Sequence, residues 1–142
     1  MMTWADYECW LLPLCVWREA RSEGPAGMAA VAHVVINRMG KWQKSISSVI
    51  TAQNQFSAMT VRGDPGTVQW PAINDKTFQL AMSVCDDALR GKDKDPTGGA
   101  TFYRNPKTAT SEWFQREIAE SGKYEISAVI GRHEFWREKG AT

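Results

Sequence analysis

The stretch Trp17-Arg18-Glu19-Ala20-Arg21-Ser22-Glu23-Gly24 lies between two segments with helical patterns and fixes how they meet. Before it, apolar residues recur at helical spacing from Tyr7 to Cys15, which predicts a helix, or two short helices divided at Pro13. After it, Pro25 occupies the first position of the next helix, where proline is tolerated. The stretch therefore predicts a junction of two helices that carries two carboxylates, Glu19 and Glu23.

The remaining sequence predicts a mainly helical α+β fold with a small β region near its C-terminal part. The segment from Ala26 to Arg38 is apolar on nearly every face and predicts the buried central helix. A short helix from Ser45 to about Ala52 and an amphipathic helix from Asn74 to about Leu89 follow. A short aromatic strand at 102–103 and one or two strands between Glu125 and Arg137 complete the fold. Residues 58–73 have no clear period and are a candidate cleft wall, whereas the polar tract 108–122 is ambiguous between loop and helix.

Length and charge limit the possible classes of protein. A chain of 142 residues fits a single domain, residues 1–142, with one hydrophobic core. Its 17 Lys and Arg residues are scattered and balance 16 Asp and Glu residues, which argues against nucleic-acid binding and a polybasic membrane anchor. The longest apolar run, Trp10 to Trp17, is far shorter than the roughly 20 residues of a membrane-spanning helix and follows no basic segment. We therefore expect folding in the cytoplasm.

The cysteines and tryptophans predict mostly core positions. Cys9, Cys15 and Cys85 lie in apolar segments without metal-ligand spacing, which predicts buried free thiols. Three of the seven tryptophans, Trp4, Trp10 and Trp17, belong to apolar segments and are expected in the core. The other four lie in polar or loop-like surroundings, where a ligand-contacting ring is as plausible as a core ring: Trp42, Trp70, Trp113 and Trp136.

Glu19 is the candidate proton donor of the chain. Burial beside apolar groups such as Trp17, and the negative end of a helix dipole, both raise the pKa of a carboxyl group. The alternative is a surface salt bridge with Arg18 or Arg21, which the local sequence alone favours. Glu23 opens the next helix, where an ionised carboxylate is stabilised. It can hold the loop or an arginine, or serve as a second carboxylate, and we favour structural support.

Other catalytic patterns do not occur in the sequence. His33 and His133 are far apart, and neither Cys-x-x-Cys nor His-Glu-x-x-His is present, so we expect no metal site and no cofactor. Gly-x-Ser-x-Gly and P-loop motifs are also missing. His33, on an otherwise apolar helix, is expected to be a hydrogen-bonded core residue.

Four ordered blocks resemble the spore cortex-lytic enzyme (SleB/CwlJ) type of cell wall hydrolase. They are Glu19-Ala20-Arg21-Ser22-Glu23-Gly24 with Gly27, Ala30-Val31 and Asn37-Arg38; Gln55-Phe56-Ser57; Asp95-Pro96-Thr97-Gly98-Gly99-Ala100 with Phe102-Tyr103 and Asn105-Pro106; and Gly131-Arg132-His133 with Phe135. The family's Gly-Glu-Ala-Arg-Gly-Glu form differs here in that Arg18 and Ser22 replace the two glycines.

The resemblance implies a lysozyme-like catalytic domain, in which a helical lobe carries the catalytic glutamate and a small β region closes the cleft. It implies an enzyme that cleaves the MurNAc–GlcNAc bond of peptidoglycan glycan strands as a lytic transglycosylase, leaving a 1,6-anhydro product. By position in the motif, Glu19 is the catalytic residue and Glu23 supports it. His133 matches a terminal motif, where we favour a structural role. The residues that would orient or stack the sugars are Gln55, Phe56, Ser57, Tyr103 and Asn105.

Several alternatives stay open at this point. The nearest is a muramidase that uses water and a second carboxylate; an N-acetylmuramoyl-L-alanine amidase and a non-catalytic peptidoglycan-binding module are more distant. A short version of the family without a signal peptide resembles a phage or prophage endolysin. We expect such a protein to be monomeric, to accumulate in the host cytoplasm, and to need a separate holin-like pore to reach the cell wall.

Overall fold

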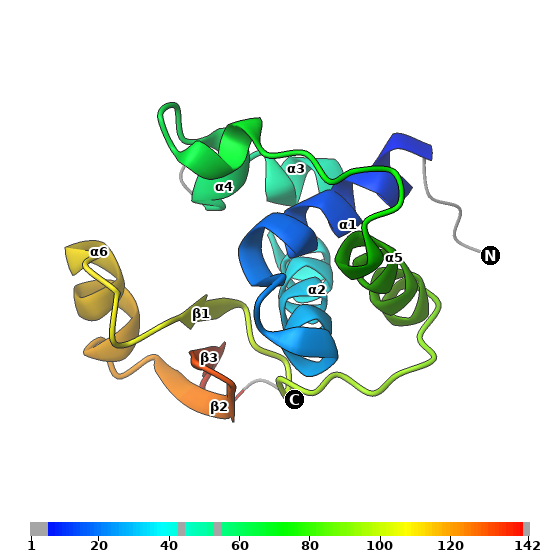
Figure 1. Cartoon of the computed structure of the whole chain (residues 1–142). Helices are drawn as coiled ribbons and strands as arrows, with labels where there is room; N and C mark the ends of the chain where they lie inside the picture. Colours follow the sequence, from blue (N-terminus) through cyan, green and yellow to red (C-terminus); the bar gives the residue numbers. More distant parts are fainter. Residues whose placement is uncertain (1–5, 43–44, 53–54, 141–142) are drawn as a thin grey trace.

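The computed structural model describes residues 6–42, 45–52 and 55–140. Figure 1 shows a helical lobe, formed by α1 to α5, beside a sheet lobe, formed by the three strands with α6 and η2. The elements in chain order are α1 (Asp6–Ala20), α2 (Gly24–Lys41), α3 (Ile46–Ile50), α4 (Ser57–Thr60), the 3-10 helix η1 (Pro65–Val68), α5 (Lys76–Leu89), β1 (Phe102–Arg104), α6 (Glu112–Phe114), the π-helix η2 (Gln115–Ala119), β2 (Tyr124–Ile130) and β3 (His133–Glu138). The predicted mainly helical α+β fold is confirmed.

The junction of α1 and α2 forms where the sequence predicts it. Helix α1 continues through Pro13 as a single helix and ends at Ala20. Gly24 opens α2 with φ of 75°, a left-handed conformation that favours glycine, and Pro25 follows in the first turn. The two helices are therefore joined by a tight turn that keeps Glu19 and Glu23 close to the same end of the helical lobe.

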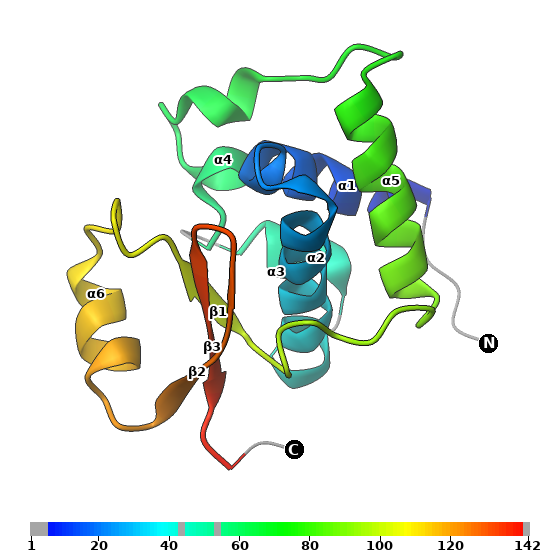
Figure 2. The same ribbon diagram turned by 60° about the horizontal axis from the view of Figure 1, so that its bottom comes forward.

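Helix α2 is the buried centre of the helical lobe, as predicted. Figure 2 shows α1, α3 and α5 around it. Most of its apolar residues belong to a core built from all four helices, and members of this core with less than 2% exposure include Leu12, Val16, Val31, Ile50 and Ala81. His33 is also buried, in agreement with the expected core position, but its expected hydrogen bond is not formed within the described residues: Nε2 has no partner there, and Nδ1 lies 4.0 Å from Asp95 Oδ1. Such a helix, apolar on nearly all faces, is stable only when neighbours cover every side.

Side-chain caps set the starts of the short helices. Ser45 Oγ accepts a hydrogen bond from the Ser48 N–H at 3.2 Å, and the Ser45 N–H donates in return to Ser48 Oγ at 3.2 Å, which forms a capping box. Asp75 caps α5 by accepting from the Phe78 N–H at 2.8 Å. Residues 58–73, which showed no sequence period, contain two four-residue helices, α4 and η1.

The sheet has the antiparallel order β1-β3-β2 and packs between α2 and α6 (Figure 2). Phe135 faces α2 in a cluster with Val34. Its neighbour Trp136 faces the other way and packs with Phe114 and Ile118. Successive side chains of a strand point to opposite faces, so each lobe packs on its own side of β3. The predicted C-terminal β region is thus a β2–β3 hairpin joined to β1.

Asp95 fixes the loop that leads into β1. Its carboxylate accepts hydrogen bonds from the Thr97 N–H at 2.8 Å, the Thr97 hydroxyl at 2.7 Å and the Gly99 N–H at 3.0 Å. Asn37 of α2 donates to it at 2.9 Å. Burial alone would raise the pKa of Asp95, but the hydrogen bonds from Asn37 and Thr97 outweigh it and lower that pKa. The block from Asp95 to Ala100 in the family resemblance therefore has a structural role, because it fixes the loop before β1.

Of the cysteines and tryptophans expected in the core, two are exposed and one lies outside the described residues. Trp10 is 58% exposed and Cys9 is exposed, although Glu8 in the same turn of α1 is buried and accepts a hydrogen bond from the Ser47 N–H at 3.1 Å, so only one face of this turn is covered. Cys15 and Cys85 are buried free thiols, as predicted. Trp17 is buried as expected, and Trp4 lies outside the described residues.

Candidate active site

Glu19 lies in the last turn of α1, where the two lobes meet. The Tyr103 hydroxyl of β1 and the backbone N–H of Ala58 in α4 both face its carboxyl group. Burial is the main cause of a raised pKa of Glu19, and the negative charge of Asp64 raises it further. The contacts with Tyr103 and Ala58, and the charge of Arg38, lower it only in part. Glu19 therefore keeps its proton to a higher pH than an exposed glutamate does.

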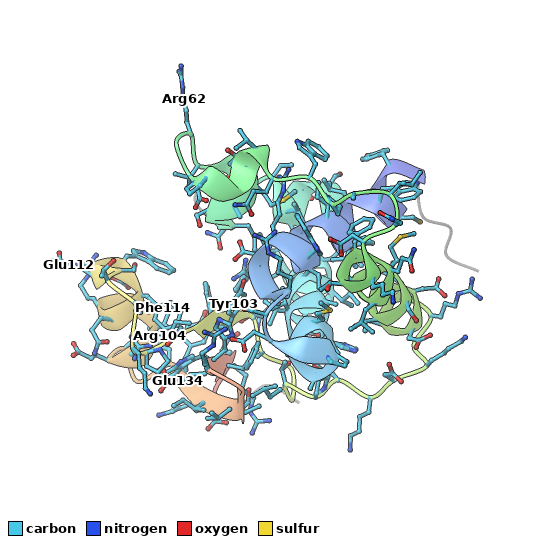
Figure 3. The ribbon with its side chains drawn as sticks, in the orientation of Figure 1. Arg62, Tyr103, Arg104, Glu112, Phe114 and Glu134 are labelled. Atoms are coloured by element: carbon cyan, nitrogen blue, oxygen red, sulfur yellow. The ribbon has the colours of Figure 1, made fainter. Side chains whose placement is uncertain are left out.

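Strand alternation delivers Tyr103 to Glu19. In Figure 3, Tyr103 lies between the helices and the sheet, while Arg104 points to the α6 side. There Arg104 Nε donates to Glu134 Oε1 at 3.0 Å, and its guanidinium lies 5.0 Å from the centre of the Phe114 ring. Adjacent residues of β1 thus serve different purposes, because their side chains leave the strand on opposite faces.

Arg18 and Arg21, the residues that the sequence offered as salt-bridge partners for Glu19, are engaged elsewhere. Arg18 Nε donates to the backbone oxygen of Gln69 at 3.0 Å, and Arg18 Nη1 donates to that of Ala58 at 3.3 Å. Arg21 Nη2 donates to the Gln69 side chain. Arg18 therefore ties α4 and the segment after η1 to the end of α1, where they bury Glu19.

Asp64 is the carboxylate whose charge acts on Glu19, and sequence reasoning missed it. It caps η1, because its Oδ1 accepts from the Gly66 N–H at 2.8 Å. Gly66 packs so closely on α4 that an added Cβ would lie 2.7 Å from the Ala58 Cβ. This packing holds the Asp64 turn beside the backbone that contacts Glu19. The sequence Asp64-Pro65-Gly66 is typical of a capped turn, and this pattern could have identified Asp64 as a residue fixed beside α4.

Glu23 joins the start of α2 to the turn of the β2–β3 hairpin. Its side chain is 8% exposed, and its Oε1 lies 3.2 Å from Arg132 Nε and 3.1 Å from His133 Nδ1. Gly131, in the same turn, has φ of 59°, and an added Cβ would lie 3.1 Å from Glu23 Oε2. Ser22, at the second replaced glycine, contacts Arg132 Nη2 at 2.9 Å. The carboxylate of Glu23 is thus committed to contacts between the lobes.

His133 connects the two glutamates through Tyr103. Its ring packs edge-on against the Tyr103 ring, with 5.3 Å between their centres, while its Nδ1 contacts Glu23. Burial is the main cause of a lowered pKa of His133, with Arg132 adding to it and Glu23 opposing it. His133 therefore stays neutral near pH 7 and supports the tyrosine that contacts Glu19.

A cleft between the two lobes begins at Tyr103. It comprises two cavities of about 570 and 240 Å³, and both are lined by Arg38, Gln55, Phe102 and Trp113. The larger cavity also contacts Tyr103, and the smaller one extends to Trp42. The cavities thus run away from the Tyr103–Glu19 contact along the boundary between the lobes.

A larger apolar cavity of about 880 Å³ lies elsewhere, between α1, α5 and the segment at Trp70. Trp10, Ile73 and Phe78 are among its lining residues, and no carboxylate or histidine lines it. Acid–base chemistry needs a titratable group near the reacting atoms. Among the described residues no carboxylate lines the two cleft cavities either, but Tyr103, which lines the larger one, contacts the Glu19 carboxyl group, so these cavities are the candidate active site.

The residues predicted to contact sugars occupy different positions. Gln55 is exposed at the cleft, and Ser57 is exposed at the start of α4. Phe56 is 1% exposed and lies beneath the Arg38 guanidinium, 5.1 Å from it, so its ring has no free face for a sugar. Tyr103 lines the cleft. Asn105 caps the turn after β1 by accepting from the Lys107 N–H at 3.0 Å.

The sequence left open whether four tryptophans contact a ligand or fill the core, and the structure gives each of them a definite position. Trp42 and Trp113 line the cleft and are 45% and 48% exposed. Trp136 is a core residue between the sheet and α6. Trp70 lies on the other face of the helical lobe, at the apolar cavity, with the Arg18 guanidinium 4.7 Å from its ring centre.

Two further properties concern the described residues alone. Within residues 6–42, 45–52 and 55–140, no group of three or more His, Cys, Asp or Glu side chains is arranged to hold a metal ion. In the same part of the chain, every helix is too short or too polar to cross a membrane.

Comparison with known proteins gives consistent matches. The profile of the cell wall hydrolase family matches residues 22–136. The spore cortex-lytic enzymes of Halalkalibacterium halodurans and Bacillus subtilis are 36% and 32% identical to this chain over 125 and 118 residues, or 85% and 80% of its length. These alignments span 34% and 35% of the two relatives, so the chain covers about a third of their length.

Two solved structures share the fold. The catalytic domain of the germination-specific lytic transglycosylase SleB from Bacillus anthracis has a TM-score of 0.73 and 28% identity, and the match covers 96% of this chain and 99% of that one. The catalytic domain of the Bacillus cereus SleB protein has a TM-score of 0.73 and 29% identity, with 96% and 94% covered.

The fold and the site together define a mainly helical, lysozyme-like α+β domain in which Glu19, with its raised pKa, contacts Tyr103 at the wall of an interlobe cleft. The chain belongs to the cell wall hydrolase family. The family resemblance seen in the sequence is thereby confirmed. The family profile begins at Ser22 and so does not include Glu19.

Proposed function

We propose that this chain cleaves the MurNAc–GlcNAc bond of peptidoglycan as a lytic transglycosylase, with Glu19 as its catalytic residue. The observation that carries the proposal is the raised pKa of Glu19 at its contact with Tyr103, which lines the cleft. A carboxyl group that holds its proton can donate it to a leaving oxygen and then act as a base. The fold shared with a domain described as a lytic transglycosylase supports this reaction.

The proposed reaction has two proton transfers, both at the Glu19 carboxyl group. Glu19 first protonates the glycosidic oxygen, so that the bond to C1 of MurNAc breaks and the other sugar leaves with a free hydroxyl. The Glu19 carboxylate then takes the proton of the MurNAc C6 hydroxyl while O6 bonds to C1. The product is a 1,6-anhydro ring, and Glu19 is again protonated, so no water is consumed.

The neighbours of Glu19 suit this cycle. Tyr103 can hold the carboxylate in position between the two transfers, because its hydroxyl faces the carboxyl group. Asp64 contributes a negative charge that favours the protonated form of Glu19 at the start. The same charge favours the positive charge that develops on the sugar ring as the bond breaks.

The test is the Glu19→Gln variant on purified sacculi, with products analysed by mass spectrometry. Loss of a general acid costs roughly a factor of 10²–10⁴ in rate. We expect the rate at which Glu19→Gln clears sacculi to be lower than the wild-type rate by about this factor. We expect the wild type to release anhydro-muropeptides. Clearing by Glu19→Gln at the wild-type rate would refute the assignment, and released stem peptides with intact glycan would indicate an amidase.

A muramidase is the second candidate, and the position of Asp64 favours it specifically. A lysozyme-type hydrolase uses a second carboxylate to stabilise the sugar or activate water, and Asp64 is the carboxylate that acts on Glu19. Digestion in ¹⁸O-labelled water separates the two reactions. A hydrolase incorporates ¹⁸O at new reducing ends and depends on Asp64, whereas a transglycosylase incorporates none.

The cellular setting is a further proposal based on the sequence resemblance. In it the chain is a phage-type endolysin that acts as a monomer, accumulates in the host cytoplasm and reaches the wall through a separate pore. Expression in the cytosol with and without a pore-forming holin tests this. Lysis that requires the pore supports the endolysin role, and lysis without it contradicts that role.

A further inference from the structure

The smaller cavity of the cleft is walled by aromatic rings. Phe102 lies at its base, with 5.3 Å between its ring centre and that of Trp42 and 5.8 Å between its centre and that of Trp113. Phe102 is 8% exposed, whereas the two tryptophans are about half exposed. Each indole therefore rests on a buried ring and leaves part of its surface in water.

One charged side chain reaches this aromatic cavity from the core. Arg38 lines it and is only 5% exposed. Arg38 Nε donates to the backbone oxygen of Thr101 at 2.6 Å, and its guanidinium lies 5.2 Å from the Phe102 ring centre. Arg38 Nη1 is buried and has no hydrogen-bond partner in the described part of the chain. A buried N–H without an acceptor is costly, so this group is suited to a ligand that brings one.

The cavity also has the size and position of a sugar site. Its volume of about 240 Å³ equals that of about eight water molecules, enough for one sugar ring but not for a chain of them. It adjoins the cavity at Tyr103, whose hydroxyl faces Glu19. A ring bound there would belong to the same glycan strand as the bond at Glu19.

We propose that Trp42, Phe102 and Trp113 form a remote subsite for one N-acetylated hexosamine of the glycan strand, whose acetamido oxygen accepts a hydrogen bond from the Arg38 guanidinium. The apolar C–H face of a pyranose ring covers an exposed indole and removes it from water. The acetamido oxygen supplies the acceptor that the buried guanidinium lacks. This subsite rests on the proposed function, because it assigns the cleft to a glycan.

Binding is measured without turnover by using the full chain with Glu19→Gln. Tri-N-acetylchitotriose is the probe, because it carries the N-acetylated ring without lactyl groups or peptides, and cellotriose is the matched sugar without acetamido groups. Indole N–H resonances report on each tryptophan separately. We expect chitotriose to shift the signals of Trp42 and Trp113 but not those of Trp10 and Trp70, and cellotriose to bind at least tenfold more weakly.

Protein variants test the same contacts. We expect Trp113→Ala and Trp42→Ala each to weaken chitotriose binding about tenfold or more, as expected for a ring that anchors a ligand. Trp10→Ala, which removes an exposed tryptophan on α1 outside the cleft, is the control and keeps wild-type affinity. Arg38 is buried and its loss can unfold the chain, so the comparison of the two sugars tests its role without altering the protein.

The outcomes separate this inference from the proposed function. Wild-type cleavage of sacculi together with unchanged chitotriose binding in both cleft variants would overturn the subsite and leave the function standing. Equal binding of cellotriose and chitotriose would overturn the role of the acetamido group. If the wild type leaves sacculi intact, the proposed function fails, whether or not the protein binds chitotriose or cellotriose.

Discussion

Replacement of Glu23 tests whether the two glutamates of the junction have separate roles. Glu23→Gln keeps the shape of the side chain and removes its charge. The carboxylate is 8% exposed and contacts His133 and Arg132 of the β2–β3 turn. If Glu23 only joins the lobes, Glu23→Gln lowers the stability of the fold and keeps the rate of sacculus clearing, whereas Glu19→Gln loses that activity.

The size of the loss follows from the two contacts. A hydrogen bond to a charged group contributes about 1.5–3 kcal/mol and a neutral one about 0.5–1.5 kcal/mol, so the buried contact with His133 loses about 1–1.5 kcal/mol. The contact with Arg132 adds about 0–1 kcal/mol, because that side chain is 61% exposed and regains water. The total is about 1–2.5 kcal/mol. For a chain of this size, this lowers Tm by about 2–10 °C.

Calorimetry and urea denaturation at pH 7 measure the stability, and sacculus clearing well below Tm measures the activity. Glu125→Gln is the control: it removes a carboxylate from an ion pair on the same hairpin, 2.9 Å from Arg137 Nε, in which both side chains are more than a third exposed. We expect Glu125→Gln to change stability by less than about 1 kcal/mol. Wild-type stability of Glu23→Gln, combined with a loss of kcat as large as that of Glu19→Gln, would refute the division of roles.

Three further predictions concern the carboxyl group of Glu19. Tyr103→Phe removes a contact that lowers the pKa of Glu19, so the alkaline limb of the kcat–pH profile moves to higher pH, and kcat falls about 10–100-fold because one hydrogen bond to a charged group is lost. Asp64→Asn keeps a hydrogen-bond acceptor for the Gly66 N–H but removes a negative charge that raises the pKa of Glu19, so the alkaline limb of the kcat–pH profile moves to lower pH. If this limb does not move, Asp64 does not act on Glu19. Glu19→Gln stabilises the fold at pH 7, because the raised folded-state pKa makes the folded chain ionise less readily than the unfolded chain, so ionisation opposes folding at pH values above the ordinary pKa. Melting curves across pH should show this gain vanish below the ordinary value of 4.5, where Glu19 is protonated in both states.

Sequence periodicity predicted most of the fold because long helices bury a continuous face. The central helix and α5 were identified in this way, and the segment from Glu125 to Arg137 was expected to contain one or two strands. Helices α4 and η1 were not, since elements of four residues are too short to show a period. Trp10 was assigned to the core because its spacing fits a helix face, but a pattern cannot show where the neighbouring helices stop covering that face.

The candidate site was predictable only where its residues lie in recognisable motifs. Glu19 and Tyr103 belong to such blocks, and the structure brings them together. Asp64 lies in the segment without a period, and its effect on Glu19 depends on the close packing of Gly66 against Ala58. Local sequence alone favoured a salt bridge of Glu19 with Arg18 or Arg21, but Arg18 reaches Gln69, 51 residues away along the chain. Contacts of this range depend on the tertiary fold, which local patterns do not encode.

The raised pKa of Glu19 is therefore a property of the assembled lobes. On α1 alone, Glu19 would be a solvated residue near two arginines, which is why the local sequence favours a salt bridge. Its burial requires α4, which Arg18 holds against α1, and β1, which brings Tyr103 from the sheet. Tyr103 packs on His133, and His133 contacts Glu23. The second glutamate thus supports the first through two aromatic side chains, because it anchors the hairpin that positions Tyr103 at the carboxyl group of Glu19.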